Sequence, residues 1–160
     1  MSAPALEFVR VTAPLGGALG DFLADLRAAG DEPFFHPHPL TREHATVIAA
    51  DAGPDLYYAA TLGGRVVGYA MLRGWAEGYE VPSLGIAMHP TARGTGIGRA
   101  FMHFLHAAAR ARGATRVRLK VYRANARARA LYSSIGYEFT PLGDDELLGI
   151  LPLSGAGAAS

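Results

Sequence analysis

The sequence predicts an α/β domain in which helices pack against a β-sheet. Short apolar runs that alternate like half-buried strands recur along the chain. One longer segment carries an apolar stripe at helical spacing, and a glycine-rich segment joins it to the apolar run before it. A length of 160 residues suits one domain, which we expect to span 1–153, with 154–160 as a flexible tail.

The composition favours a compact protein and excludes several classes. Half of the residues are hydrophobic (50%), and the net charge of +1 is far from that of a dedicated nucleic-acid binder. The absence of cysteine excludes disulfides, zinc thiolate sites and a thiol nucleophile. No stretch approaches the ~20 apolar residues of a membrane span. Glu7 and Arg10 lie where a signal peptide would need an unbroken apolar core. We therefore expect a cytoplasmic protein without nucleic-acid or membrane partners.

The chain begins with the pattern of a strand followed by a helix. Residues 6–12 roughly alternate, and 15–29 place leucines and a phenylalanine at helical spacing. Three prolines in 31–40 exclude regular structure, so we expect an extended loop there that faces the substrate. Thr41 is the expected cap of a second, short helix.

The middle of the chain predicts an antiparallel hairpin. The apolar runs 56–62 and 66–72 are separated by Gly63-Gly64, which accepts the positive φ angles of a tight turn. A turn containing the tryptophan follows at 73–79, and 81–88 is the next apolar run.

The last part of the chain alternates helices and strands. A helix is predicted for 97–112, with 97, 100, 101, 104, 105 and 108 as its apolar stripe and His103 and His106 on its surface. A strand over 115–122 and a short helix over 125–134 follow. The glycines at 113 and 136 end the two helices. A final strand pair near 137–140 and 146–151 closes the sheet.

The segment Arg93-Gly-Thr-Gly-Ile-Gly98 has the features of a pyrophosphate-binding loop. Successive backbone N–H groups at a helix start can point at one anion, and the helix end adds about half a positive charge. Arg93 and Arg99 add full charges beside it. The spacing is not that of a dinucleotide fold, and a Walker-type lysine is missing. A plain tight turn is the alternative interpretation.

Basic residues gather farther along, between Arg110 and Arg129. They fit either a solvated helix face and strand edge or the binding of a multiply charged anionic ligand.

Two segments carry a resemblance to a known family: Ile86-Ala-Met-His-Pro-Thr-Ala-Arg-Gly-Thr-Gly-Ile-Gly-Arg99 and Asn125-Ala-Arg-Ala-Arg-Ala-Leu-Tyr-Ser-Ser-Ile-Gly-Tyr137. Together they resemble the GCN5-related N-acetyltransferase (GNAT) family, strongly over 84–139 and loosely, by strand order, over most of the rest. The resemblance implies a mixed, mostly antiparallel sheet of six or seven strands with a central V-shaped splay, flanked by about four helices. It also implies an acetyl-CoA-dependent N-acetyltransferase.

The resemblance implies where acetyl-CoA, the acyl-donor cosubstrate, binds. It would lie where the strand ending at Met88 splays from the strand 115–122, with the backbone at Ile86, Ala87 and Met88 binding pantetheine and the acetyl carbonyl. Asn125 would contact the cofactor, and Tyr132 would lie next to the thioester sulfur. The pyrophosphate would bind the amides of Arg93, Gly94, Thr95, Gly96, Ile97, Gly98 and Arg99.

Acetyl transfer to an amine needs a base for the amine and an acid for the leaving thiolate. An alkylamine with a pKa near ~10 is almost entirely protonated at pH 7. Tyr132 is the expected general acid, with a core tyrosine as the alternative interpretation. The position that carries a glutamate in some family members is Lys120 here, so Glu80 becomes the first candidate base, acting through water. The alternative interpretation of Glu80 is an exposed charge at a strand end. His36 and His38 are the next candidates for the base.

The acceptor is expected near the turn before the central strand. Trp75, Tyr79 and Glu80 combine aromatic faces with a carboxylate that can hold an amine, although an ordinary exposed turn fits as well. His36 and His38 are further candidate substrate-binding residues, and no metal is expected because His-x-His lacks a carboxylate partner.

Three functions remain open from the sequence. The favoured one is direct transfer of acetyl to the primary amine of a small molecule, and weak similarity of 73–84 to amino-sugar enzymes of the family makes an amino sugar one candidate. The alternatives are a protein or peptide N-acetyltransferase and a non-catalytic acetyl-CoA-binding module. A monomer or homodimer is expected.

Overall fold

The computed structural model describes residues 3–31, 33, 35 and 37–153, and the tail predicted for 154–160 lies outside them. Its strands form one seven-stranded sheet in the order β1-β2-β3-β4-β5-β7-β6. The strands are β1 (Leu6–Arg10), β2 (Leu56–Leu62), β3 (Arg65–Arg73), β4 (Ser83–Met88), β5 (Arg116–Tyr122), β6 (Glu138–Leu142) and β7 (Glu146–Pro152).

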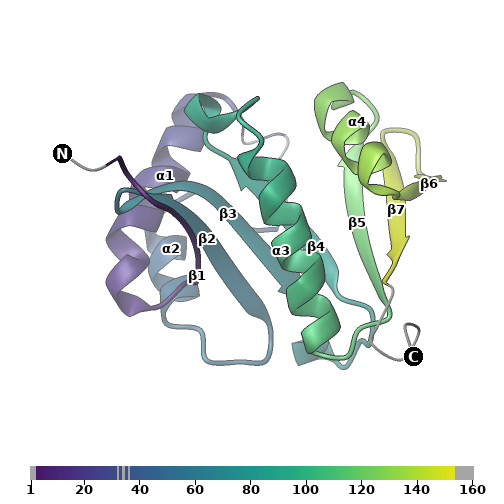
Figure 1. Ribbon diagram of the computed structural model, residues 1–160, viewed down its shortest axis with the longest axis horizontal. Coiled ribbons are helices and arrows are strands. Elements are labelled where there is room, and N and C mark those ends of the chain that lie inside the picture. The colour runs from purple at the N-terminus through teal and green to yellow at the C-terminus, as the bar shows by residue number, and fades with distance from the viewer. Residues whose placement is uncertain (1–2, 32, 34, 36, 154–160) are drawn as a thin grey trace.

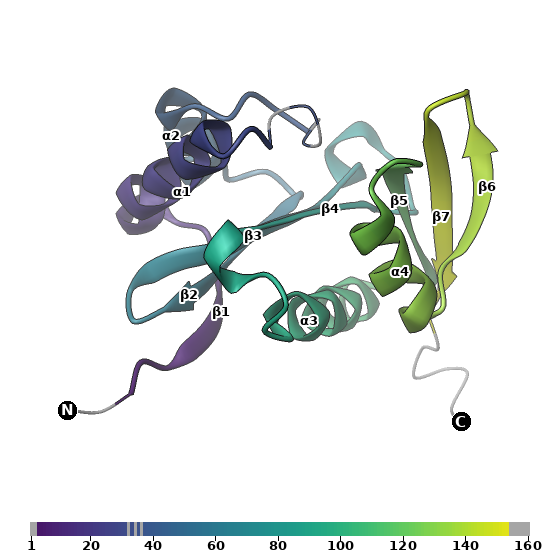
Figure 2. The ribbon, with the colours of Figure 1, turned by 90° about the horizontal axis from the view of Figure 1, so that it is seen from above.

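Four α-helices flank this sheet: α1 (Gly16–Ala28), α2 (Arg42–Ala49), α3 (Ile97–Ala111) and α4 (Ala126–Ile135). Short 3-10 turns occur at η1 (Ala13–Leu15), η3 (Trp75–Glu77) and η4 (Pro90–Ala92). Helices α1 and α2 lie on one side of the sheet, whereas α3 and α4 lie on the other (Figures 1 and 2). The predicted α/β fold with a mixed, mostly antiparallel sheet is confirmed. In the part of the chain that is described, no helix is long and apolar enough to cross a membrane.

The helix cap and the hairpin turn predicted from local sequence patterns are present in the structure. The Thr41 side chain caps α2 by accepting a hydrogen bond from the His44 N–H at 3.1 Å. Gly63 and Gly64 adopt φ angles of 61° and 81° in the β2–β3 turn, as a tight hairpin requires. Strand and helix bounds otherwise agree with those predicted to within a few residues.

The sheet opens between its two central strands. β4 and β5 run parallel and share one register pair, Ser83 with Arg118, where the Arg118 N–H donates to the Pro82 carbonyl at 3.1 Å. Beyond this pair the strands diverge toward their carboxyl ends, whereas β3–β4 and β5–β7 are paired along most of their lengths. This is the central V-shaped splay, and it separates the sheet into two wings (Figure 1).

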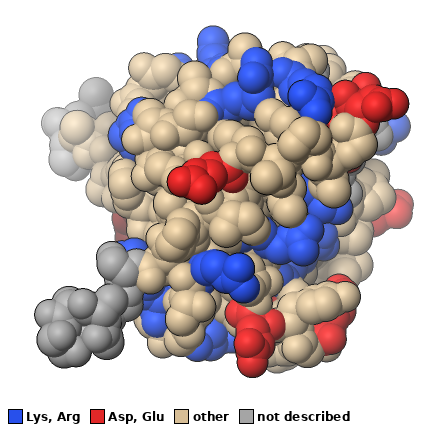
Figure 3. All heavy atoms as spheres, turned by 90° about the vertical axis from the view of Figure 1, so that its right-hand side faces the viewer, with Lys and Arg blue, Asp and Glu red and all other residues tan. Residues whose placement is uncertain are grey.

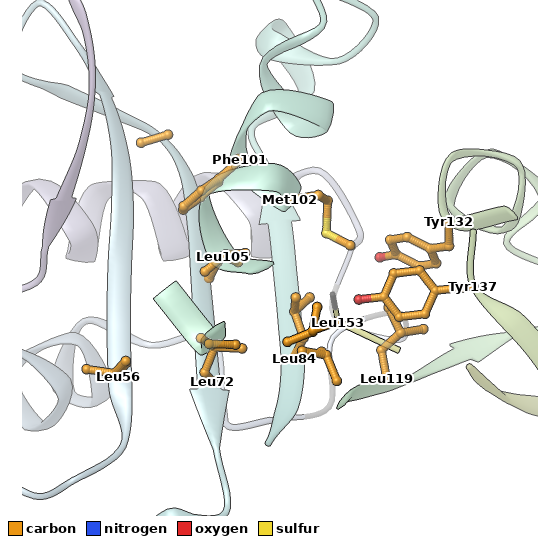
Figure 4. Packing of buried hydrophobic residues seen from close by; sticks show 14 of the residues in the cluster. Leu56, Leu72, Leu84, Phe101, Met102, Leu105, Leu119, Tyr132, Tyr137 and Leu153 are labelled. Carbon is orange, nitrogen blue, oxygen red and sulfur yellow. The ribbon is translucent and has the colours of Figure 1, made fainter. Parts of the chain in front are cut away.

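Two apolar cores lie on opposite faces of the sheet, and the first contains residues of both wings whereas the second belongs to the wing of β1–β4. One lies between the sheet and α3, where Phe101, Met102 and Leu105 pack toward Leu72 and Leu84, with Tyr132 and Tyr137 approaching from the α4 side (Figure 4). The other lies on the opposite face and contains buried side chains of α1 together with Tyr69 of β3. Because both faces are covered, β3 is buried along almost its whole length.

The buried face of α3 is rotated from the predicted stripe. Phe101, Met102, Leu105, His106 and Ala109 are buried, whereas the side chain at 100 is exposed. The surface position predicted for His106 is therefore wrong, while that of His103 is confirmed. A hydrogen bond of 2.7 Å between His106 Nε2 and the Tyr137 hydroxyl satisfies both polar groups inside the core. Burial lowers the pKa of His106 to about 4, so its ring is neutral.

Candidate active site at the strand splay

The backbone of β4 offers its polar groups to the splay. Backbone N–H and C=O groups alternate in direction along a strand, and the Pro82 carbonyl points to β5 while the His89 N–H points to β3. The groups of Ile86 and Met88 therefore face the opening, beyond the last contact with β5. Those of Ala87 face β3, where Ala87 is paired with Tyr69. Of the three backbone positions expected to bind pantetheine and the acetyl carbonyl, Ile86 and Met88 therefore present their polar groups to the splay, whereas Ala87 does not.

Two cavities meet in the splay. The first, called the loop cavity, has a volume of about 410 Å³ and is bordered by the β4–α3 connection and α4. The second, called the hairpin cavity, has about 300 Å³ and reaches the end of the β6–β7 hairpin. Both are lined by Phe35, Ile86, Asn125 and Tyr132. A ligand in one cavity can therefore contact a ligand in the other at these four residues.

The glycine-rich connection at one edge of the loop cavity has an open surface. Gly94 and Gly96 adopt φ angles of 75° and 85°, which favour glycine, and no described atom lies within 4 Å of a Cβ placed on either. Gly96 is the N-cap of α3, so it supplies no side-chain acceptor for the first helical N–H groups. Thr95 closes the turn by donating to the Ala92 carbonyl at 2.5 Å. The residues present therefore fit a phosphate-bearing ligand that approaches the backbone closely.

The two arginines next to this connection already have partners. Arg93 pairs with Asp31 at 2.5 Å and also donates to the Met88 carbonyl at 3.2 Å. Arg99 donates to Ser134 of α4 at 2.9 Å. Arg93 lines the loop cavity, and so does Arg127, an exposed residue on the first turn of α4. Part of the positive charge expected from Arg93 is thus offset by Asp31.

The base of the connection is fixed to α1. His89 Nδ1 accepts a hydrogen bond from the Thr91 N–H at 3.2 Å, which leaves the proton on Nε2, and Nε2 donates to Asp25 at 3.0 Å. This bond ties the end of β4 to α1, and the Arg93–Asp31 pair ties the connection to the segment that follows α1. The connection is thereby held in place without any ligand.

Tyr132 lies at the junction of the two cavities. It projects from α4 beside Tyr137, with ring centroids 5.8 Å apart, and both hydroxyl groups point toward the α3 and β4 side (Figure 4). Only 8% of its surface is exposed, and burial raises the pKa of its hydroxyl to about 12. The hydroxyl therefore keeps its proton over the physiological range and can donate it to a more basic group. This position suits the predicted general acid.

Asn125 fixes the start of α4 in the same place. Its side-chain oxygen accepts from the Ala128 N–H at 3.3 Å, which is a standard helix cap. The side-chain NH₂ group remains as a donor on a residue that lines both cavities. The structure is thus compatible with the contact that the family resemblance implies for Asn125.

The hairpin cavity carries two charged side chains, those of Arg73 and Glu146, that the sequence analysis did not single out. Arg73 at the end of β3 and Glu146 at the start of β7 line it together with Lys120 of β5. Glu146 pairs in register with Tyr122, which brings the last strand pair beside the splay. Long-range pairing of this kind leaves no local signal in the sequence, so Glu146 was missed.

Basic residues spread over the face formed by the β6–β7 edge and α4 (Figure 3). Arg116, Lys120, Arg123 and Arg127 are exposed. Lys120 lines the hairpin cavity and Arg127 lines the loop cavity, so the basic cluster noted in the sequence contributes to both.

The predicted acceptor residues of the tryptophan turn lie elsewhere. Trp75 packs against the core and under the Arg112 guanidinium, 4.9 Å from its ring centroid. Arg112 follows the C-terminal end of α3, opposite to the end at the glycine-rich connection. Tyr79 is 62% exposed, and Glu80 is exposed as well. None of Trp75, Tyr79 and Glu80 lines either cavity.

His38 supports the loop instead of lining a cavity. Its Nδ1–H donates to the Pro39 carbonyl at 2.8 Å, and its Nε2 accepts from the Tyr69 hydroxyl at 2.8 Å. Burial, followed by the charges of His44 and Arg73, lowers the pKa of His38 to about 4. Both ring nitrogens are engaged, which leaves no lone pair for an amine proton. The other loop histidine considered, His36, lies outside the described residues.

Comparison with known proteins adds independent evidence. The sequence matches the acetyltransferase (GNAT) family over residues 22–137, well over half of the chain. No curated protein gave a match. Among solved structures, the ribosomal-protein-S18-alanine N-acetyltransferase from Escherichia coli is 23% identical, covering 96% of this chain and 97% of that one, with a TM-score of 0.71.

Two other structures share the fold over nearly the whole chain. A GCN5-related N-acetyltransferase from Kribbella flavida is 23% identical, with coverage of 93% and 98% and a TM-score of 0.76. An acetyltransferase structure from Salmonella typhimurium with its cofactor acetyl-CoA is 18% identical, with coverage of 93% and 94% and a TM-score of 0.74. The splayed sheet, the glycine-rich connection and the family match agree, and this chain belongs to the GNAT family of acetyl-CoA-dependent acetyltransferases.

Proposed function

We propose that this acetyltransferase transfers acetyl from acetyl-CoA directly to the primary amine of a small molecule. The supporting observation is that two separate cavities meet at Ile86, Asn125 and Tyr132. Bound acetyl-CoA supplies an activated acetyl group as a thioester. In the proposal, the donor occupies the loop cavity and the amine occupies the hairpin cavity.

Residues of the loop cavity and of the glycine-rich connection at its edge bind the donor in this proposal. The amides from Gly94 to Arg99 hold the pyrophosphate at the α3 N-terminus, and Arg127 adds positive charge from α4. The Ile86 and Met88 backbone groups hold the extended part of the donor as an added strand would, because β5 leaves them open. A Met88 N–H at the reacting carbonyl would favour charge that develops on its oxygen.

Tyr132 provides the proton that the departing sulfur needs. Burial raises the pKa of the hydroxyl, and the same environment disfavours a thiolate as well. The reference pKa of a tyrosine is near ~10 and that of a thiol is near ~8.5, and this difference in pKa corresponds to a free energy of about 2 kcal/mol. That difference is small enough for a proton transfer coupled to bond cleavage.

The size and lining of the hairpin cavity favour a small acceptor. Its volume of about 300 Å³ is at the low end of the range of about 300–1,000 Å³ that is common for ligand pockets. Phe35 and Pro37 line it, and the Pro37 carbonyl accepts a hydrogen bond from Arg73 at 3.2 Å. This hydrogen bond holds Pro37 at the cavity wall, which favours a small acceptor over an extended peptide in this proposal. The proposal keeps the cytoplasmic location and the monomeric or homodimeric state expected from the sequence.

The test is an acetylation assay with a panel of small amines, amino sugars included, and a matched panel of peptides with free N-termini or lysines. CoA release is followed with a thiol reagent, and acetylated products are identified by mass spectrometry. We expect turnover of small amines and at least tenfold lower kcat/KM for peptides. Faster peptide turnover would favour a protein N-acetyltransferase. Acetyl-CoA binding without any product would favour a non-catalytic module.

A further inference from the structure

The hairpin cavity contains charges of both signs. Of the described residues that line it, Arg73 and Lys120 are cationic and Glu146 alone is a carboxylate. A simple alkylammonium ion would be attracted by Glu146 and repelled by the two cations. A ligand with one positive and one negative group would match the cavity better.

The strand register places Lys120 and Glu146 on one face of the sheet. Glu146 is directly opposite Tyr122, and Lys120 is two residues before Tyr122 on the same strand. Side chains at positions i and i+2, and those of directly paired residues, project from the same face. Val121 projects to the other face, where it joins the core that includes Tyr132.

Among the described residues, neither Lys120 nor Glu146 forms an ion pair. The two are diagonal neighbours in the ladder, a relation that separates Cα atoms by about 7–8 Å. The ion pairs of the described residues involve other side chains. Both groups are therefore available to a ligand between them.

Arg73 is a partly positioned anion-binding group. One of its terminal nitrogens donates to the Pro37 carbonyl at 3.2 Å, and both residues line the cavity. A guanidinium has five N–H donors in a planar fork, so several remain for a carboxylate or phosphate. Its hydrogen bond to the loop also links acceptor binding to the position of Pro37.

We propose that the acceptor is a small primary amine that also carries a carboxylate or phosphate group. Arg73 and Lys120 bind the anionic group, and Glu146 binds the ammonium and takes one of its protons. This inference rests on the proposed function, because it places the acceptor in the hairpin cavity. It also replaces Glu80 by Glu146 as the group that receives the amine proton.

The proton balance of the transfer follows from this arrangement. The ammonium gives one proton to the Glu146 carboxylate, which passes it to solvent. The nitrogen–carbon bond forms as the carbon–sulfur bond breaks, and the second proton lost by nitrogen replaces the one that Tyr132 gives to sulfur. No oxidant or reductant is involved.

The experiment compares acceptors in matched pairs. One arm uses amino acids against the corresponding amines that lack the carboxylate, such as leucine and isopentylamine. The other arm uses glucosamine 6-phosphate against glucosamine. We expect kcat/KM to be at least tenfold higher for the anionic member in one arm, and that arm identifies a carboxylate or a phosphate as the anion.

Variants test the assignment of each charge. Lys120→Gln should raise KM for the anionic acceptor about tenfold and leave the neutral acceptor and the KM of acetyl-CoA unchanged. Arg116→Gln is the matched control, because Arg116 is exposed on the same strand and does not line the cavity. Glu146→Gln should lower kcat by about 100-fold or more, whereas Glu138→Gln on the same hairpin should not.

Each outcome separates this inference from the proposed function. Equal turnover of both members of every pair, or turnover of neutral amines alone, would overturn the inference and leave the proposed function intact. Equal effects of Lys120→Gln on anionic and neutral acceptors would also overturn it. If peptides alone are acetylated, both the inference and the proposed function fail.

Discussion

Replacement of Tyr132 by phenylalanine separates its chemical role from its packing role. The ring stays in the core, where it is 8% exposed, and only the hydroxyl at the junction of the cavities is lost. Loss of a general acid lowers a rate by about 10²–10⁴-fold. We therefore expect kcat to fall by at least 100-fold, with the dissociation constant of acetyl-CoA changed by less than about threefold and the melting temperature almost unchanged.

Tyr137→Phe is the matched control, because this ring is 5.8 Å from that of Tyr132. Its hydroxyl bonds His106 Nε2 at 2.7 Å in the core, so the variant leaves a buried ring nitrogen without its partner. This costs about 1–3 kcal/mol, which lowers the melting temperature by roughly 2–4 °C for each kcal/mol in a domain of this size. We expect that loss of stability with kcat kept within about threefold.

Steady-state kinetics, calorimetric binding and thermal denaturation of both variants form the assay. Because burial raises the pKa of Tyr132 to about 12, kcat of the wild type should show no alkaline decrease up to about pH 10. A Tyr132→Phe variant with normal kcat, or one whose loss of activity follows a loss of stability, would refute the assigned role.

Further predictions concern the loop, the buried histidines and Glu80. Gly96→Ala should weaken acetyl-CoA binding at least tenfold in calorimetry. A φ of 85° is strained for alanine, and its Cβ would occupy the open surface of the connection. The control variant Gly17→Ala in α1 should leave binding unchanged. His38 and His106 have pKa values lowered from 6.5 to about 4, so the folded state binds fewer protons than the unfolded state between these values. The free energy of unfolding should be highest above about pH 6.5 and fall as pH drops toward 4, by at most about 1.4 kcal/mol per pH unit for each histidine, and a flat profile in urea titrations would contradict this. Glu80→Gln should keep kcat/KM within about twofold, because Glu80 is exposed and lines neither cavity; a large decrease would restore it as the base.

Elements with local causes could be predicted from the sequence. The hairpin at Gly63-Gly64, the Thr41 cap and the helix after Gly96 depend on residues within a few positions of one another. The resemblance added the splay, which spacing alone does not reveal, because it results from strands that come together from distant parts of the chain. Residues tied to those local features, from Gly94 to Gly98 and at Asn125, could therefore be predicted as cofactor-binding candidates, and that role remains a prediction.

The residues of the proposed acceptor site could not be predicted from local sequence patterns. Glu146 reaches the hairpin cavity through the pairing of β7 with β5, and Arg73 reaches it through the β3–β4 register. Histidine is a polar residue that sequence analysis places at the surface. The burial of His106 depends on a hydrogen bond to the hydroxyl of Tyr137, which is 31 positions later in the sequence. Trp75 and Glu80 are close to β4 in sequence, but the turn of η3 carries them away from the splay.

Hydrogen exchange of the backbone with and without acetyl-CoA tests the location of the donor most directly. If the donor lies along the splay, exchange should slow at residues 86–88, 94–99 and 124–132, where the loop cavity and the glycine-rich connection lie. Residues 75–80 should be unaffected. Protection confined to 75–80, or to the outer face of α1 and α2, would contradict the assignment of the splay as the active site.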